Sequence, residues 1–594
     1  MSFTKAPDLA TRPTLRGHYG MAASTHWLAT AAAQSVLERG GNAFDAAAAG
    51  GFVLHIVEPH LNGPGGDMPA IFATAEDPQP RVLMGQGPAP AKASTEYYQS
   101  LGMDSVPGAG GLAAAVPAAT EAWLALVRDH GVLPLSEVLE YAISYAEEGH
   151  AVLPRVVQTL PGLKELFEEH WPTSANHWLP GGEAPKPWQV ITNPAYGALL
   201  REMAEAPGDS REDQIEAARK IWKQKLGAAV EKNLETPHRH ADGKDYAPVI
   251  TAADIDEFTP SYEEAATITF RGYTIAKTGP WGQGPALLQA LKILEGYEDH
   301  QLDPSTEEGV HLISEAIKLA FADRDTYYGD TEVNLEYLLS EEYAATRRAL
   351  ITEKASTEFR PGDLPGVDKI LPPLQEGSPS PGTAPAGTGE PTVAKTGETK
   401  GDTCHIDIVD AAGNIISATP SGGWLQSSPH LPEVGFPLGT RLQMNLLEPG
   451  HPATLAPGKR PRTTLTPTLV LKDGKPIIAL GTPGGDQQEQ WQLPMLLRVL
   501  IGGYTLQEAI DAPNFHTTSI LGSFYPRTIE PGGLVVEDRL GDEVISGLEA
   551  RGHKVKRAGD WALGRLSAVS RDPETGQLHA GANPRGDQGY AAGR

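Results

Sequence analysis

Cysteine is almost absent from this sequence, which holds one residue of that type, Cys404, in 594 positions. A single cysteine cannot form an intramolecular disulfide or supply the thiolates of a cysteine-based zinc site. Positive charge is also scarce, since 48 lysines and arginines face 75 aspartates and glutamates, and the formal net charge is −27. Because this surplus repels phosphate backbones and anionic lipid surfaces, neither nucleic acid nor a membrane is an expected partner.

Long apolar runs are missing as well. No stretch is long enough to span a bilayer, and residues 1–8 contain no apolar core of the kind that a secretory signal needs. A cytoplasmic location is therefore expected. At 594 residues the chain has room for several domains or for one large α/β unit with a substantial core.

Cofactor and metal signatures are weak. The segment Gly282-Gln283-Gly284 lacks the third glycine and the acidic partner of a dinucleotide site, and Gly458-Lys459 is followed by an arginine where a phosphate loop needs serine or threonine. His238-Arg239-His240 lies in a polar stretch without further ligand spacing, which favours a solvated loop. The sequence therefore predicts neither a cofactor nor a metal.

The first half of the chain reads as mainly helical. Apolar spacing predicts helices at 24–39 and 43–57, with Asn42 as the N-cap of the second, and helical patterns dominate from about 120 to 350. Pro285 near the first position of a helix predicts a helix start after Gly284. The glycine-dense loop 61–67 is interpreted as a packing turn, with a direct substrate role as the alternative.

The composition shifts sharply at residues 360–402, where prolines alternate with glycine, serine and threonine. Such a segment buries too little apolar area to offset its ordering entropy, so it is interpreted as an exposed linker. Two hairpins are predicted after it, 403–410 with 415–419 and 466–471 with 476–480, followed by helices at 492–501, 506–511 and 542–551. The expected organisation is a core of 1–359, a linker of 360–402 and a second part of 403–594.

Four segments share an order and spacing that is more specific than any one of them. They are Gly40-Gly41-Asn42-Ala43-Phe44-Asp45, Asp402-Thr403-Cys404-His405, Lys459-Arg460-Pro461-Arg462-Thr463-Thr464 and Gly481-Thr482-Pro483-Gly484-Gly485. Together they resemble the γ-glutamyltransferase (glutathione hydrolase) family of N-terminal-nucleophile hydrolases. The resemblance implies an α+β fold, a four-layer αββα sandwich.

The resemblance also implies a catalytic apparatus. Thr403 matches the nucleophile, which is released when the precursor cuts itself after Asp402. A free N-terminal threonine joins a hydroxyl nucleophile to an amine base whose pKa is about 8. Ser421 matches the residue that orients the new amine, and Gly484 and Gly485 match the pair whose N–H groups receive the oxyanion.

The substrate residues match less completely. Thr463 and Thr464 match a pair that binds the α-carboxylate of a γ-glutamyl group, and Glu448 and Asn445 match residues that hold its α-amino group. Gln86 stands where the family has an arginine for the carboxylate. Loss of a charge-assisted hydrogen bond costs about 1.5–3 kcal/mol, which puts γ-glutamyl specificity, but not amide hydrolysis, in question.

Two neighbours of Thr403 offer alternative chemistry. Strand alternation turns Cys404 away from the face of Thr403, so packing is favoured over a nucleophilic role. His405 shares that face and is expected to be a packed strand residue rather than a general base.

The first expectation for function is hydrolysis or transfer of γ-glutamyl groups from compounds such as glutathione, with water or an amine as acceptor. One alternative is an acylase for glutaryl or cephalosporin-type acyl groups, favoured by Gln86. Another is an unprocessed binding protein. Large and small subunits from one precursor are expected, with a dimer of these heterodimers as an open alternative.

Overall fold

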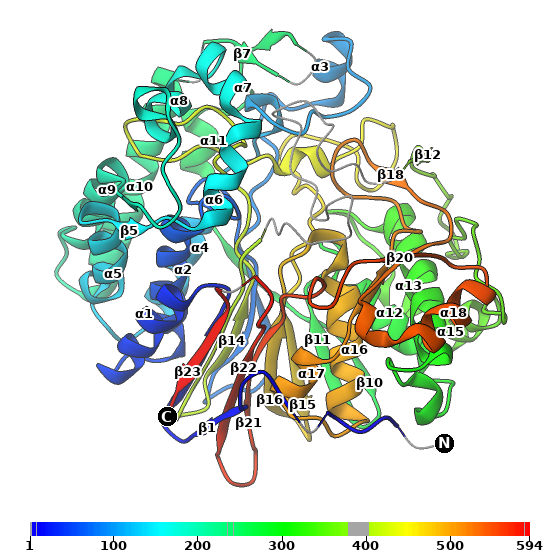
Figure 1. The fold of residues 1–594 in the computed structure, drawn as a ribbon. Helices are drawn as coiled ribbons and strands as arrows, with labels where there is room; N and C mark the ends of the chain where they lie inside the picture. The colour runs from blue at the N-terminus through cyan, green and yellow to red at the C-terminus, as the bar shows by residue number, and fades with distance from the viewer. Residues whose placement is uncertain (1–2, 8, 234–235, 241–242, 378–402, 587) are drawn as a thin grey trace.

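Two stacked β-sheets form the centre of the molecule in this computed structural model (Figure 1), which describes residues 3–7, 9–233, 236–240, 243–377, 403–586 and 588–594. Each sheet has seven strands, and every neighbouring pair is antiparallel. The first sheet has the order β1 (Leu15–Gly17), β22 (Leu578–Ala582), β21 (Ser567–Arg571), β16 (Lys475–Gly481), β15 (Thr468–Lys472), β11 (Tyr273–Lys277) and β10 (Ala266–Phe270). The second has the order β23 (Tyr590–Gly593), β2 (Gly20–Ser24), β13 (Ile406–Asp410), β14 (Ile415–Ala418), β3 (Ala70–Ala73), β4 (Arg81–Met84) and β9 (Ser261–Glu264).

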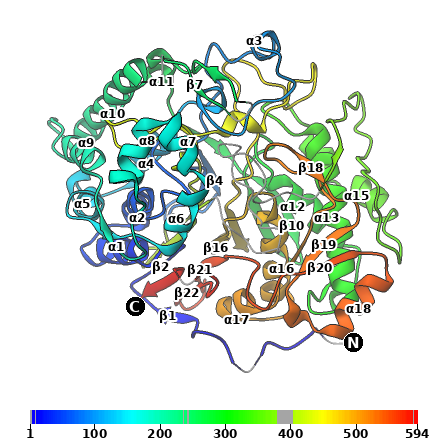
Figure 2. The same cartoon turned by 45° about the horizontal axis from the view of Figure 1, so that its top comes forward.

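Helices cover the outer face of each sheet, as Figures 1 and 2 show from two directions. On the second sheet lie α1 (Trp27–Glu38), α2 (Ala43–Val57), α4 (Ala119–His130), α5 (Leu135–Glu147), α9 (Pro194–Ala204) and α10 (Arg211–Asn233). On the first lie α12 (Gly284–Leu294), α13 (Glu307–Tyr327), α15 (Glu341–Arg348), α16 (Gln488–Leu500), α17 (Leu506–Asp511) and α18 (Asp542–Ala550). This order of helix, sheet, sheet and helix confirms the predicted four-layer sandwich.

Shorter elements surround these layers. The helices are α3 (Thr95–Ser100), α6 (Pro154–Thr159), α7 (Lys164–Glu169), α8 (Pro172–Trp178), α11 (Ala252–Glu257) and α14 (Leu335–Leu338). The strands are β5 (His150–Ala151), β6 (Val190–Ile191), β7 (His238–Arg239), β8 (Asp245–Tyr246), β12 (Gln375–Glu376), β17 (Phe515–Thr517), β18 (Thr528–Ile529), β19 (Gly533–Val536) and β20 (Lys554–Arg557). Within the described ranges, no helix combines the length and the apolar character that crossing a bilayer requires.

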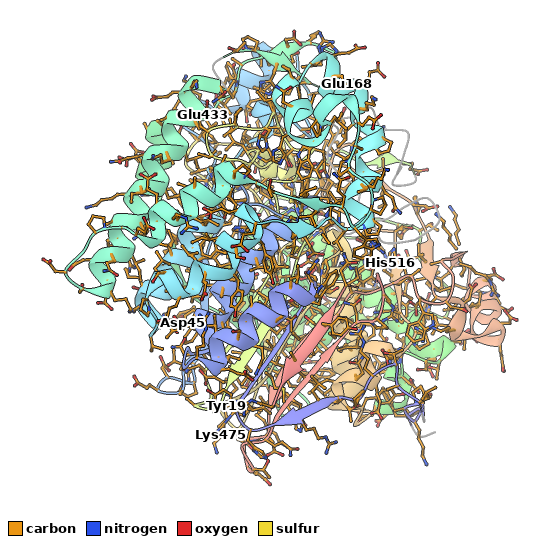
Figure 3. All side chains as sticks on the ribbon, turned by 60° about the vertical axis from the view of Figure 1, so that its left-hand side comes forward. Tyr19, Asp45, Glu168, Glu433, Lys475 and His516 are labelled. Carbon is orange, nitrogen blue, oxygen red and sulfur yellow. The ribbon has the colours of Figure 1, made fainter. Side chains whose placement is uncertain are left out.

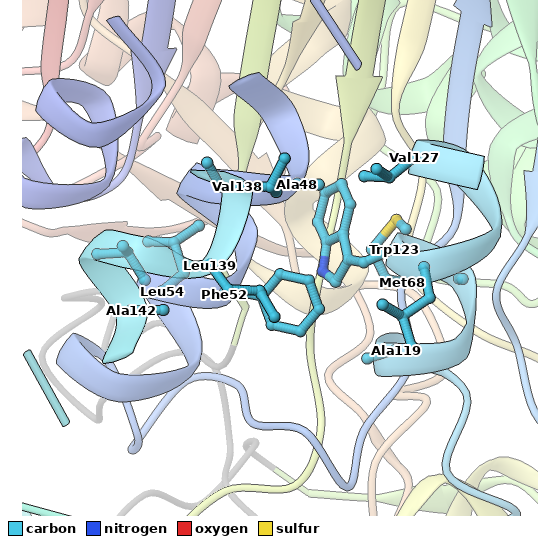
Figure 4. Packing of buried hydrophobic residues seen from close by; sticks show 14 of the residues in the cluster. Ala48, Phe52, Leu54, Met68, Ala119, Trp123, Val127, Val138, Leu139 and Ala142 are labelled. Atoms are coloured by element: carbon cyan, nitrogen blue, oxygen red, sulfur yellow. The ribbon is translucent and has the colours of Figure 1, made fainter. Parts of the chain in front are cut away.

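Helix α2 shows how the sequence places an element at the centre of a core. Asn42 caps it with a reciprocal capping box, and every residue from Ala43 to Val57 is buried. A Cβ on Gly51 would lie 2.4 Å from the indole of Trp123, so glycine allows α2 and α4 to approach closely. Figure 4 shows that indole beside Phe52, among aliphatic side chains of α2, α4 and α5.

Strand β13 distributes its side chains between two cores. Ile406 and Ile408 pack against the helical layer, whereas Val409 belongs to the apolar core between the sheets. On the same face as Val409, Asp407 accepts a hydrogen bond of 2.8 Å from Ser567 of the opposite sheet. Because alternate residues share a face, Thr403 lies on the side that looks between the sheets.

Most predicted elements are present, with shifted ends. Both predicted hairpins form, and α2, α17 and the start of α12 agree with the sequence, but α16 begins at Gln488 rather than at 492. The segment expected to be a linker from 360 contains β12, which pairs with β18 in parallel. Residues 378–402 lie outside the described residues, and with them the predicted cleavage residue Asp402.

The prediction of a solvated loop at 238–240 is wrong. His238 and His240 are buried, and each accepts a hydrogen bond through Nε2, from the backbone N–H groups of Gly111 and Leu112 at 2.9 and 3.3 Å. The imidazoles therefore serve a structural purpose, because they satisfy backbone donors that would otherwise be unpaired.

Candidate active site

Thr403 lies just before β13 and is almost fully buried, with 1% of its surface exposed. It forms an isolated antiparallel bridge with Ser421, and the two hydroxyl oxygens are 3.1 Å apart. The backbone N–H of Cys404 donates to the carbonyl of Pro420 at 2.9 Å, which extends the pairing. Ser421 is therefore held against the predicted nucleophile by backbone as well as side-chain contacts.

The glycine loop 61–67 supports Ser421 from the other side. Asp67 and Ser421 exchange two backbone hydrogen bonds of 2.9 Å. A Cβ on Gly66 would lie 2.1 Å from the carbonyl oxygen of Ser421, and one on Gly63 would lie 2.5 Å from that of Gly423. These distances favour the packing interpretation of the loop, because only glycine lets the two backbones come this close.

A buried ion pair lies behind this turn. Arg441 donates to both carboxylate oxygens of Asp67, at 2.6 and 2.8 Å, and both side chains are buried. Burial raises the pKa of Asp67, and Arg441 opposes that rise. A Cβ on Gly422 would lie 3.7 Å from Nη2 of Arg441, so the guanidinium reaches the turn that carries Ser421. The sequence contains no local signal for this pair.

The predicted oxyanion turn begins at the same end of the sandwich as Thr403. Strand β16 runs from Lys475, near Tyr19 at the lower end of Figure 3, to Gly481. A Cβ on Gly481 would lie 2.2 Å from the ring of His405, so the end of β16 packs directly on the residue two positions after Thr403. The turn at 484–485 therefore starts close to the level of Thr403.

The geometry of this turn suits an anion receptor. Gly484 and Gly485 have φ angles of 127° and 51°, a region that L-residues with side chains avoid. Within the part of the chain that the structure describes, neither backbone N–H has a hydrogen-bond acceptor. Two unpaired donors on consecutive residues can bind the oxyanion of a tetrahedral intermediate.

We expect Gly484→Ala to lower kcat for amide hydrolysis by roughly 100-fold or more, because loss of one oxyanion donor has an effect of that size. The new Cβ would lie 2.3 Å from the ring of Trp491, which must displace the turn. Gly474→Ala is the matched control, since Gly474 also has a positive φ but has open space around it. Equal kcat values for the two variants, measured per cut chain, would contradict the assignment.

The predicted carboxylate-binding segment lies beside this turn. Thr463 donates its backbone N–H to the carbonyl of Trp281 at 3.0 Å, and Thr464 has a buried hydroxyl without a partner among the described residues. The segment around Gln86 runs alongside, because Ala89 exchanges backbone hydrogen bonds of 2.7 and 2.9 Å with Lys459 and Gly458.

Gln86 itself is fully buried, and neither atom of its amide makes a hydrogen bond of normal geometry in the described residues. The amide is nevertheless near enough to Asp67 to oppose the rise in the pKa of that carboxyl. Gln86 therefore faces the Asp67–Arg441 pair.

Glu448 and Asn445, the residues predicted to hold an α-amino group, both lie near Arg527. Arg527 donates to the carbonyl of Asn445 at 2.9 Å, and burial lowers the pKa of this arginine to about 10 although Glu448 opposes the shift. Oε2 of Glu448 is buried without a partner among the described residues. This carboxylate is available to a cationic group.

The hydrogen bonds around His405 and Cys404, the two alternative reactive residues, indicate structural roles for both. His405 is fully buried, with Nδ1 2.9 Å from the hydroxyl of Thr419 and Nε2 2.9 Å from Asp407. Cys404 lies 2.9 Å from Glu58, and burial together with this carboxylate raises the pKa of its thiol well above the usual value. Both predictions of packing are confirmed, because a thiol kept protonated is a poor nucleophile.

One group of side chains has the spacing of metal ligands. Ligand atoms of His311, Glu315 and His553 lie within 4.8 Å of one another. Both ring nitrogens of His311 are already engaged, with His553 at 2.9 Å and the carbonyl of Thr352 at 2.7 Å, and Glu315 is paired with Lys318 and Arg360. We assign no metal to this group.

The chain is similar to known proteins over nearly its whole length. The sequence profile described as Gamma-glutamyltranspeptidase matches residues 29–593. The chain is 30% identical to the Glutathione hydrolase-like YwrD proenzyme of Bacillus subtilis (strain 168), over 96% of this chain and 98% of that protein. Among solved structures, LmbA2991HD has 50% identity and a TM-score of 0.92, with 99% of this chain and 100% of that chain covered. The cephalosporin acylase from Bacillus halodurans has 28% identity and a TM-score of 0.81, with 99% and 98% covered. A match that spans nearly the whole chain shows that it belongs to the gamma-glutamyltranspeptidase family of enzymes.

Proposed function

We propose that this chain is a self-processing amide hydrolase whose nucleophile is Thr403. After the peptide bond before Thr403 is cut, the new α-amine accepts the proton of the hydroxyl while Oγ1 attacks the amide carbonyl. The N–H groups of Gly484 and Gly485 stabilise the oxyanion. The protonated amine then gives its proton to the leaving amine, and water, or an acceptor amine, releases the acyl group from the threonine ester. The 3.1 Å contact between Thr403 and Ser421 is the observation that carries this proposal, because it fixes the nucleophile beside its orienting residue.

Cutting would leave one folded unit of two subunits, residues 1–402 and 403–594. The second sheet places β13 and β14 of the small subunit between β2 and β3 of the large one, and the first sheet is interleaved in the same way. Strand pairing across the cut keeps the subunits together without a covalent link. Relatives named as proenzymes agree with such processing.

The acyl pocket favours a substrate with a carboxylate and without an ammonium group. The cation of Arg441 lies against the Ser421–Gly422 turn, and Gln86, facing the same ion pair, adds no negative charge. An ammonium beside a buried guanidinium would be repelled, since like charges in a dry site repel each other strongly. A glutaryl-type acyl group therefore suits the site, in agreement with the similarity to a cephalosporin acylase.

A γ-glutamyl group is the second candidate. The unpartnered carboxylate oxygen of Glu448 could accept a hydrogen bond from its α-ammonium, and one relative is named glutathione hydrolase-like. The two candidates differ only in whether this ammonium is recognised.

A pair of anilides separates these candidates. We expect kcat/KM for a glutaryl anilide to exceed that for the γ-glutamyl anilide by about tenfold or more, because the latter brings an ammonium that the guanidinium of Arg441 repels. Gln86→Arg should raise kcat/KM for the γ-glutamyl anilide by about tenfold, since a charge-assisted hydrogen bond contributes about 1.5–3 kcal/mol.

The exposed Gln79 provides the control, because Gln79→Arg adds the same charge at a solvent-exposed position between β3 and β4. A wild type that already prefers the γ-glutamyl anilide, together with no gain in Gln86→Arg, would contradict the acylase assignment. A chain that is never cut and hydrolyses neither anilide would instead indicate a binding protein.

A further inference from the structure

The segment Trp281-Gly282-Gln283 of the predicted large subunit lies against the predicted active site. Gln283 is fully buried and stands at the N-cap position of α12, but its side chain makes no capping hydrogen bond. Its side chain instead extends to the oxyanion turn of the small subunit. The hydrogen bonds of this amide join segments that are 202 and 41 residues away in the sequence.

The amide of Gln283 has a partner for each of its polar atoms. Nε2 donates to the carbonyl of Gly485 at 3.0 Å and also to Glu489. Oε1 accepts a hydrogen bond of 2.8 Å from Arg324. These partners fix which way the amide points, because the carbonyl of Gly485 can only accept a hydrogen bond and Arg324 can only donate one.

Arg324 also binds Asp486, the residue that follows the turn. Arg324 donates to Asp486 at 2.5 Å, and the backbone N–H and hydroxyl of Ser523 donate to Asp486 at 2.8 and 2.6 Å. The carbonyl of Gly485 and the carboxylate of Asp486 are thus both held by hydrogen bonds to other segments.

Glu489, a hydrogen-bond partner of Gln283, is itself close to a second buried charged residue, Lys277. Burial raises the pKa of Glu489 to about 7 and lowers the pKa of Lys277 to about 8. The two side chains are 3.8 Å apart, and Lys277 also donates to the carbonyl of Thr466 and the hydroxyl of Thr468 at 3.0 and 2.7 Å. Hydrogen bonds to several segments hold the ammonium of Lys277 in place within this buried network.

We propose that Gln283 is a positioning residue for the oxyanion turn of the small subunit, an inference that rests on the proposed amide hydrolysis. A glycine turn has no side chains to fix its peptide planes, so the hydrogen bond to the carbonyl of Gly485 restricts rotation about that residue. The same segment pairs with Thr463, through the carbonyl of Trp281 at 3.0 Å and a bridge from Gly282. One loop of the large subunit therefore sets the relative positions of the oxyanion turn and the candidate carboxylate-binding segment.

Replacement of Gln283 by methionine tests this role, because methionine keeps the length of the side chain and removes the amide. We expect Gln283→Met to lower kcat for the anilide that the wild type cleaves by about 10- to 100-fold, with KM changed less than about threefold, since a misplaced oxyanion donor acts on the transition state. Rates are counted per cut chain, with the cut fraction measured by intact mass. Gln283→Glu, which keeps an acceptor for Arg324 but loses the donor to Gly485, should lower kcat at least as far.

Gln289 provides a matched control on the same helix. It is also buried and makes two side-chain hydrogen bonds, to Asp323 at 3.0 Å and from Tyr328, neither of which involves the turn at 484–485. Gln289→Met should show a similar loss of thermal stability and a kcat within about threefold of the wild type. An unchanged kcat in Gln283→Met, or equal kcat losses in Gln283→Met and Gln289→Met, would overturn the inference. A wild type without any amide hydrolysis would instead refute the proposed function.

Discussion

Thr403→Ala should abolish both self-cleavage and turnover. The variant is expected to remain one chain of 594 residues, and its kcat for any anilide should fall by at least about 10⁴-fold. The reason is that, in the proposed mechanism, the hydroxyl is the nucleophile of the hydrolysis and the N-terminal amine that activates it exists only after the cut. Denaturing electrophoresis with intact mass measures the first effect, and an anilide assay measures the second.

Two further variants control for packing around this residue. Thr403→Ser keeps a hydroxyl and should still be cut and active. Cys404→Ala removes the thiol that lies 2.9 Å from Glu58 and should leave cutting and turnover within about tenfold of the wild type, because the buried thiol takes no part in the chemistry. Turnover that persists in Thr403→Ala, or is lost in Cys404→Ala while the protein remains folded, would place the nucleophile elsewhere.

Arg324→Met should destabilise the protein by about 3–5 kcal/mol, because removal of one partner leaves uncompensated buried charges. Arg324 is fully buried and donates to Gln283 at 2.8 Å, to Asp486 at 2.5 Å and to the carbonyl of Leu521 at 2.8 Å. Burial acts to raise the pKa of Asp486, but Arg324 and Arg462 hold it below its usual value. The free energy of unfolding from a denaturant titration measures the loss, and kcat should fall as well because Asp486 follows the oxyanion turn.

An exposed ion pair provides the comparison. Arg557 donates to Asp542 at 2.6 Å, with side chains that are 45% and 87% exposed, and exposed pairs contribute little to stability because solvent screens the charges. Arg557→Met should therefore change the free energy of unfolding far less than Arg324→Met does, and leave kcat unaltered. Equal destabilisation by Arg324→Met and Arg557→Met would show that the buried arginine does not organise the turn.

Local signals predicted much of the fold. The helix 43–57 could be located because Asn42 caps it and its residues are nearly all apolar, and the hairpin of β13 and β14 because alternating strands flank the turn 411–414. The reaction centre could be expected because Thr403, Ser421 and the two glycines stand in ordered motifs. For the helix and the hairpin the information lies within a few neighbouring residues, whereas the candidate site is expected from the joint order of motifs that are far apart in the sequence.

The supporting contacts could not be predicted in this way. Asp67 and Arg441 are 374 residues apart, and Gln283 and Gly485 are 202 residues apart. The sequence around each residue does not indicate its partner, because these pairs form only when the sheets stack. The same reason explains the error at His238, where the partners of the imidazoles come from a distant backbone segment.

The identity of the N-terminal residue of the small fragment tests the central claim most directly. Purified wild-type protein should separate on a denaturing gel into fragments of residues 1–402 and 403–594, and N-terminal sequencing of the smaller one should read Thr403-Cys404-His405-Ile406-Asp407. A single uncut chain that hydrolyses amides, or an active small fragment that begins at another residue, would contradict the assignment of Thr403 as a catalytic N-terminus.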